Sequence, residues 1–196
     1  MQASDLLIYA DQLIDLKIPQ TVTEADLLYL LTHTPSGNLR KLGGRSVKTD
    51  KGNKRGVLTM PVYMSPHREG GKNMCPGASA GCIASCLGHS SGHMTMDTQR
   101  RARIARTMFF QLYPDRFLAQ YNDEIEKHAR RAQRADMIPA YRGNGSTDIR
   151  WEKYGIPQAH PEKQFYDYTK HTACRCPSER VERYQVGGPR RAAGPP

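Results

Sequence analysis

Three of the five cysteines in this chain lie close together, in a segment that contains no charged residue. Cys75, Cys82 and Cys86 follow a C-x6-C-x3-C spacing within residues 73–96, which we call the cysteine segment. Charged residues make up 24% of the whole chain, but this segment is built mostly from Gly, Ala and Ser. Thiolates are the ligands that zinc and iron–sulfur clusters prefer. The segment therefore predicts a site for a metal ion or a cluster.

Two inorganic groups fit these residues. The first is an iron–sulfur cluster on the three thiolates, which leaves one iron open for a small ligand. The second is a zinc ion held by the three thiolates together with His89 or His93, in a closed tetrahedral site. A third interpretation keeps the cysteines free, either as small buried hydrophobes or as redox thiols. The pattern alone leaves all three open.

Further candidate residues follow two predicted strands. The strand at residues 137–142 leads into a glycine-rich turn whose backbone N–H groups can bind a cofactor or a small anion. The same letters also make an ordinary capped turn. The strand at residues 163–168 has polar residues at its carboxyl end, the functional edge of a parallel sheet. The predicted cofactor-binding residues are Gly143, Asn144, Gly145 and Ser146, and the predicted catalytic residues are Asp148, Asp167 and Lys170.

These residues need a scaffold, and the order of strands and helices predicts it. A strand at residues 56–65 precedes the cysteine segment, and Pro61 implies an edge position or a bulge for it. A helix runs from Asp97 or Thr98 to about Tyr113, and Pro114 restarts another that ends in a basic run. An apolar stripe marks the buried face of the first helix, so we expect its arginines to face water or a ligand: Arg100, Arg103 and Arg106.

The predicted fold class is α/β, an open or partial (β/α) barrel with mostly parallel strands. The roughly 115 residues from Gly56 to Lys170 are too few for a complete barrel, which needs about 250. Residues 1–34 form an N-terminal segment with helices expected near 4–14 and 23–31, and residues 35–170 form the α/β domain. Residues 171–196 are expected to be a disordered tail, which carries Cys174 and Cys176.

The chain is basic, with a net charge of +10. Positive charge concentrates in the loop expected at residues 40–55, where nucleic acid is the partner that such charge favours. No aromatic residue lies among these cations to stack on a base, so a solvated loop is the competing interpretation. Combined with zinc, the basic charge would make the protein a nucleic-acid-binding module without catalysis.

The sequence contains no apolar run long enough to cross a membrane. Its first residues carry acids rather than the basic start of a signal peptide. An odd cysteine count without a secretion signal fits a reducing compartment. We therefore expect a cytoplasmic protein that does not bind membranes.

Several blocks together resemble the phage "gene product 88" family over roughly residues 37–170. They are Gly37-Asn38, MCPGASAGCIASCLG at 74–88, the helix with Arg103 and Thr107, GNGSTDIRWE at 143–152 and QFYDYTK at 164–170. The resemblance implies a phage-encoded protein that acts in the host cytoplasm. Relatives continue with further strands beyond the last block, so we expect a truncated or altered C-terminal part here.

The layout is also similar, more loosely, to radical S-adenosylmethionine enzymes. These enzymes place a three-cysteine cluster loop after the first strand of a partial barrel, and the open iron binds the cofactor. By this similarity the turn at 143–146 would contact S-adenosylmethionine, while Asp167 or Lys170 would face the substrate. The spacing differs, because the usual motif of those enzymes is C-x3-C-x2-C.

Overall fold

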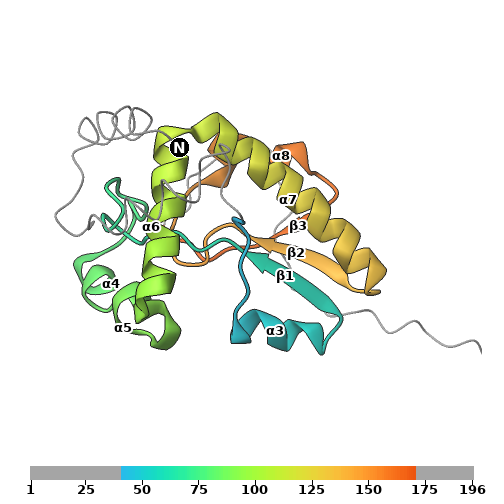
Figure 1. Ribbon diagram of the computed structural model, residues 1–196, viewed down its shortest axis with the longest axis horizontal. Helices are drawn as coiled ribbons and strands as arrows, with labels where there is room; N and C mark the ends of the chain where they lie inside the picture. Colours follow the sequence, from blue (N-terminus) through green and yellow to red (C-terminus); the bar gives the residue numbers. More distant parts are fainter. Residues whose placement is uncertain (1–40, 171–196) are drawn as a thin grey trace, which may run out of the picture.

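The computed structural model describes residues 41–170, apart from the side chains of His89 and His93. The predicted helices at 4–14 and 23–31 and the predicted tail at 171–196 lie outside these residues. The elements run in chain order as Figure 1 labels them: α3 (Val47–Asn53), β1 (Val57–Pro61), α4 (Ala80–Ala84), α5 (Leu87–Ser90), η1 (Gly92–Thr95), α6 (Asp97–Leu112), α7 (Pro114–Arg134), β2 (Ile138–Arg142), η2 (Trp151–Tyr154), α8 (Ile156–Ala159) and β3 (Gln164–Phe165).

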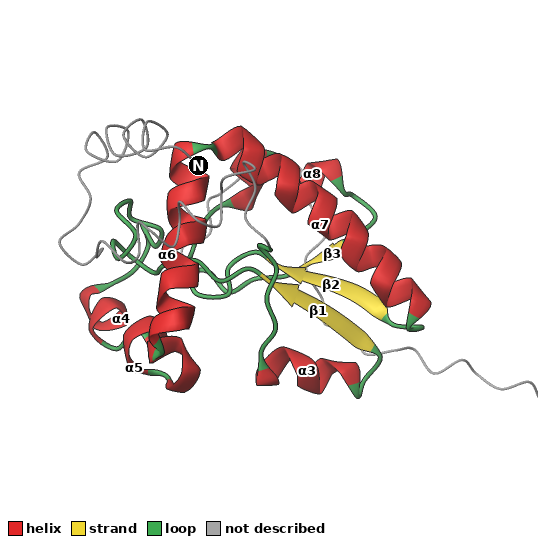
Figure 2. Ribbon diagram, in the orientation of Figure 1, coloured by secondary structure: helices red, strands yellow, loops and turns green. Residues whose placement is uncertain are grey.

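Three parallel strands form an open sheet in the order β1-β2-β3. All three point toward α6 and the region of α4 and α5, so their carboxyl ends meet at that side of the molecule (Figure 2). The mixed α/β class and the parallel strands confirm the prediction at this level. A closed or partial barrel is not formed by residues 41–170, whose three strands stay in one small sheet.

Prolines fit the sheet because of where their missing N–H groups fall. β1 is an edge strand, as Pro61 predicted, and Gly43 covers its outer side through an antiparallel bridge to Val62. Pro139 lies in the central strand β2. Its neighbour Ile138 donates to Gly56 on the β1 side, so Pro139 faces β3, whose pairing begins only at Ala140.

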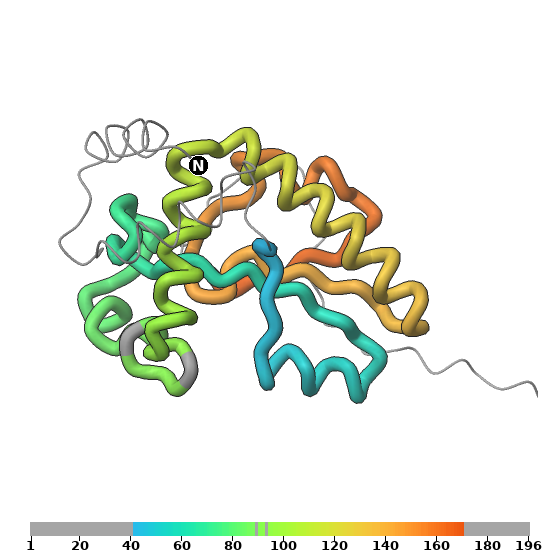
Figure 3. The backbone as a smooth tube through the Cα atoms, viewed as in Figure 1, coloured from blue at the N-terminus to red at the C-terminus, as the bar shows by residue number. Residues whose placement is uncertain are grey.

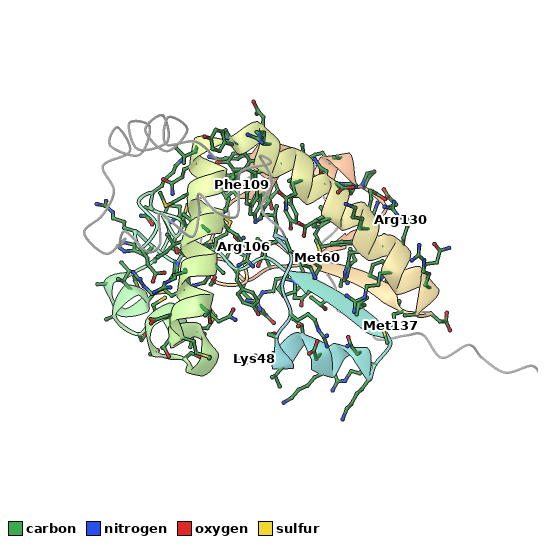
Figure 4. The ribbon with its side chains drawn as sticks, in the orientation of Figure 1. Lys48, Met60, Arg106, Phe109, Arg130 and Met137 are labelled. Atoms are coloured by element: carbon green, nitrogen blue, oxygen red, sulfur yellow. The ribbon has the colours of Figure 1, made fainter. Side chains whose placement is uncertain are left out.

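Helix α7 packs along the sheet, α6 stands at the carboxyl ends of the strands, and one apolar core joins them (Figure 1). Pro114 is in the first turn of α7 and separates the two helices at the predicted position. Phe109 on α6 and Met60 on β1, labelled in Figure 4, are both fully buried or nearly so. This core contains an aromatic cluster in which Phe117 stacks on Trp151. The ring centroid of Phe117 lies 5.0–6.3 Å from those of its aromatic neighbours: Phe109, Phe110, Tyr121 and Trp151.

The prediction of a loop throughout residues 40–55 is wrong, because Val47–Asn53 form the short helix α3. Ser46 caps this helix by accepting a hydrogen bond from the Thr49 backbone N–H, while the Thr49 hydroxyl accepts one from the Ser46 N–H. This reciprocal pair is a capping box, with Thr in the place where Glu is usual.

No helix in the described part of the chain is both long and apolar enough to span a membrane.

The cysteine segment lies between β1 and α6 in the chain, so these two elements determine where it packs. In Figure 3 the chain leaves β1, builds this segment on one side of α6 and returns through α6 itself. The segment is therefore an insertion between the first strand and its crossover helices.

Candidate functional site

The cysteine segment is mostly short helical turns. Cys82 lies in α4, where the hydroxyl of Ser79 accepts a hydrogen bond from the Cys82 N–H and so caps the helix. Cys86 is the N-cap residue directly before α5. All three thiols of the segment are free and partly buried. None of these three thiols therefore forms a disulfide, and none is fully buried in the core.

Cys75 lies against the carboxyl edge of the sheet. Its Sγ accepts a hydrogen bond from the His67 N–H at 3.3 Å and approaches the Ser146 carbonyl oxygen, to which the thiol can donate, at 4.0 Å. Burial raises the pKa of the Cys75 thiol, and negative charge on Cys86 and Asp148 raises it further. Cys75 and Cys86 are thus close enough for their charges to interact.

The loops after the three strands converge, as the parallel arrangement predicted. The Ser146 hydroxyl donates to the Met64 carbonyl at 2.6 Å, and the Asp148 N–H donates to the Met74 carbonyl at 2.9 Å. These two bonds join the loop after β2 to the loop after β1. The loop after β3 joins them because the Lys170 N–H donates to Asp148 Oδ2 at 2.9 Å.

The glycine-rich turn after β2 uses several of its N–H groups internally. The Asn144 N–H donates to Asp167 Oδ2 and the Gly145 N–H donates to the Val62 carbonyl, both at 2.8 Å. The glycines serve close packing as well: a Cβ on Gly143 would lie 2.3 Å from the Trp151 indole nitrogen. Their predicted role in binding a cofactor stays a prediction.

Asp167 is the most perturbed carboxylate at this edge. Burial raises its pKa to about 7, although the hydrogen bond from Asn144 and the positive charge of Arg142 both act in the opposite direction. Its side chain is 24% exposed, and its oxygen lies 3.8 Å from Arg142 Nε. A carboxyl group with such a pKa exchanges protons near neutral pH, which suits acid–base chemistry.

Arg103 was expected to face water or a ligand, and this prediction is wrong. Its side chain is only 2% exposed and forms an ion pair with Glu69 at 3.6 Å. It also donates to the Met94 and Gly88 carbonyls at 2.7 and 3.3 Å, so it ties the second half of the cysteine segment to α6. Burial lowers the pKa of Arg103, whereas Glu69 and Cys86 act to raise it.

The sequence contains a signal for the buried, anchoring role of Arg103. Arg103 precedes the buried Thr107 by four residues and the buried Phe110 by seven, so all three lie on one face of α6. The Thr107 hydroxyl accepts a hydrogen bond from the Ser65 N–H at 2.8 Å. The polar residues on this face of α6 therefore bind the loop after β1 and do not face solvent.

One trio of metal-binding side chains within residues 41–170 has its ligand atoms within 4.8 Å of one another, and it is not the cysteines. It consists of Glu126, His160 and Glu162. The Lys163 ammonium group contacts both carboxylates of this trio. A cation thus already occupies the centre, and ion pairing explains the cluster without a metal.

Most of the predicted basic loop at 40–55 lies within the described residues, Arg40 being outside them. Arg45 forms an exposed ion pair with Asp50 at 3.2 Å, and several lysines project from α3 and its end. Figure 4 shows Lys48 pointing away from the body of the protein. The arrangement neither adds nor removes support for nucleic acid as a partner.

A small parallel α/β protein with a cysteine segment packed on the carboxyl edge of its sheet is the class that fold and site define. A family model described as gene product 88 matches residues 36–184. The chain belongs to this family, as its sequence blocks predicted. No curated protein and no solved structure matched the chain. None of these comparisons supports the similarity to radical S-adenosylmethionine enzymes, which stays a prediction.

Proposed function

We propose that Cys75, Cys82 and Cys86 hold an iron–sulfur cluster at the carboxyl edge of the sheet. The observation that carries this proposal is the presence of three free, partly buried thiols on one short segment. Negative charge on Cys86 also acts on the pKa of Cys75. The segment has no carboxylate of its own, and Arg103 supplies buried positive charge near Cys86. Buried positive charge stabilises thiolates, which are the form that binds iron.

A single ion and a cluster demand different distances between the sulfur atoms. Around one tetrahedral zinc ion, with Zn–S bonds of about 2.3 Å, two sulfurs lie about 3.8 Å apart. The three thiols are not among the trios within 4.8 Å in the described part of the chain, so they do not already form a site for one ion. In a cluster each thiolate binds a different iron, so the sulfurs stay farther apart.

Three thiolates leave one iron of a four-iron cluster without a protein ligand. When bound, such a cluster supplies one-electron chemistry to a small molecule at that iron. S-adenosylmethionine is our candidate for this molecule, with the turn at 143–146 as its contact. Asp148 and Lys170 lie at the same edge, and Asp167 is the group there that can hold or release a proton near neutral pH.

Anaerobic preparation of the full chain tests the proposal directly. After incubation with iron and sulfide, we expect brown protein with stoichiometric iron and sulfide and visible charge-transfer absorption. Cys75→Ala, Cys82→Ala and Cys86→Ala should each reduce the iron content strongly. The matched control is Cys174→Ala combined with Cys176→Ala, which removes two thiols outside the cysteine segment and should retain the iron.

The second candidate function is a zinc-stabilised basic module, which the net charge of +10 favours. A colourless protein with one equivalent of zinc would replace the cluster by this alternative. DNA affinity that falls steeply with salt would then identify nucleic acid as the partner. Protein that binds neither iron nor zinc, with all three thiols reactive, would refute both candidates.

A further inference from the structure

A second concave site lies on the other side of the molecule from the cysteine segment, between α3, β1 and α7. It has a volume of about 400 Å³, which is within the usual range for small-molecule sites. No residue of the cysteine segment or of the loops after β2 and β3 lines it. Leu58 and Met60 from β1 supply its apolar surface, and α7 supplies most of its charged groups.

The carboxylates of this pocket are already engaged. Asp50 on α3 pairs with Arg45 at 3.2 Å, and Asp123 on α7 pairs with Lys127 at 2.5 Å. Glu124 accepts hydrogen bonds from the Leu42 and Gly43 N–H groups, both at 2.8 Å, and so fixes the chain that covers the edge of β1. Negative charge in the wall is therefore neutralised or bonded to backbone.

Two cations of the pocket have no such neutralising partner. Lys41 and Arg131 both line it, and neither takes part in an ion pair within residues 41–170. His128 lines the same pocket, and the positive charges of Arg131 and Lys41 lower the pKa of its imidazole. Cations that line one cavity without an ion-pair partner favour an anion there.

His128 is the buried polar group beside these cations. It is 9% exposed, and its Nε2 lies 2.9 Å from the Leu58 carbonyl oxygen. A carbonyl only accepts, so Nε2 carries the hydrogen and Nδ1 is the site that gains a second proton. Burial lowers the pKa of His128 first, and Arg131 and Lys41 lower it further. An anion in the pocket would reverse the effect of the two cations.

We propose that this pocket binds a small phosphate ester of nucleotide size, with Lys41, Arg131 and His128 at the phosphate and Leu58 and Met60 at the organic part. Arg45 and Lys127 offset the charges of Asp50 and Asp123, so Lys41 and Arg131 outweigh the remaining charge of Glu124. The apolar strand residues give the remainder of the ligand a surface to cover. The site is independent of the cysteine segment and of any cluster there.

The test is calorimetric titration of the full chain at low salt with adenosine 5′-monophosphate and, separately, with inorganic phosphate. Arg131→Met and Lys41→Met should each weaken nucleotide binding about tenfold, the loss of one charge-assisted contact. Both residues are exposed at the surface, so these variants should fold. The matched control is Arg130→Met, since Arg130 is the neighbouring exposed cation on α7 and does not line the pocket (Figure 4).

Two further measurements make the result specific. Nucleotide binding should depend on pH differently in wild type and in His128→Gln, because only wild type takes up a proton at this position; the titration of the ligand itself is common to both. Cys82→Ala should leave nucleotide affinity unchanged, which separates this proposal from the cluster. Equal affinities of wild type, Arg131→Met and Lys41→Met would overturn it. So would binding of a single-stranded oligonucleotide, sensitive to Arg131→Met, without any binding of the mononucleotide.

Discussion

Replacing Arg103 by methionine is expected to destabilise the protein by about 3 kcal/mol and to loosen the cysteine segment. Methionine has a similar length but removes the donors that reach the Met94 and Gly88 carbonyls at 2.7 and 3.3 Å. Hydrogen bonds from a charged group contribute about 1.5–3 kcal/mol each, and the longer bond belongs at the lower end. The lost desolvation cost of the guanidinium offsets part of the total.

Arg100→Met is the matched control for this change. Arg100 lies one turn earlier on α6 and contacts the same Glu69 at 3.1 Å, but its side chain is 28% exposed whereas that of Arg103 is 2% exposed. Partial exposure weakens an ion pair, so the control should lose about 1 kcal/mol or less. The comparison therefore isolates the buried contacts of Arg103 from the charge of Glu69.

Urea denaturation of both variants beside wild type measures the difference, with the slope checked for constancy. Thermal unfolding should show a decrease of about 6–12 °C for Arg103→Met. Iron content after anaerobic incubation should fall in Arg103→Met and not in Arg100→Met. Equal losses in the two variants, or a loss below about 1 kcal/mol for Arg103→Met, would show that the segment is held by other contacts.

Three further changes test separate features of the same edge of the sheet. Because the pKa of Asp167 is raised to about 7, ionisation of this carboxyl lowers the stability of the protein as the pH rises from about 4 to 7. Asp167→Asn should remove this cost and gain about 1–2 kcal/mol relative to wild type above pH 7, after a discount for exposure. Urea titrations across pH measure this gain. Gly145→Ala should cost about 2–3 kcal/mol, since the new methyl group would lie 2.6 Å from the Tyr63 ring. Thr107→Val should cost about 1–3 kcal/mol, because the buried Ser65 N–H loses its acceptor.

Each of these three changes has a matched control or a contrary result. An unchanged pH profile in Asp167→Asn would contradict the raised pKa of this carboxyl. Gly81→Ala is the control for Gly145→Ala, because a Cβ on Gly81 meets only the Ser79 oxygen at 4.0 Å and alanine favours a helix. Thr107→Ser keeps the hydroxyl and should recover most of the stability lost in Thr107→Val.

The sequence predicted the scaffold well where local signals and packing agree. Pro61 predicted an edge position or a bulge, and β1 is an edge strand; Pro114 predicted the boundary between α6 and α7. The rule that parallel strands share one functional edge predicts that the cysteine segment and the turn at 143–146 lie together, and Cys75 Sγ lies 4.0 Å from the Ser146 carbonyl oxygen. Each of these inferences rests on geometry that one or two residues enforce.

Other features depend on contacts between distant residues, which a single sequence does not reveal. α3 escapes prediction because its capping box uses Thr49 and Val47 is its one apolar residue, so no apolar stripe marks the helix. The predicted strand at 163–168 shortens to Gln164–Phe165, since Asp167 turns to accept the Asn144 N–H. Glu124 reaches Leu42 and Gly43 across 82 and 81 positions, and no local pattern indicates such a partner.

The pairing of β1 with the distant strand β2 also determines at which stage of folding the cysteine site can form. β1 pairs with β2 through Val57 and Ile138, so the whole connection must be closed before the sheet forms. Cys75 and Ser146, 71 positions apart, meet only after that closure. Such non-local pairing is slow compared with helix formation. We therefore expect the three thiols of a nascent chain to be accessible first, on a peptide that can chelate a metal. The surrounding protein should enclose them only at the end of folding.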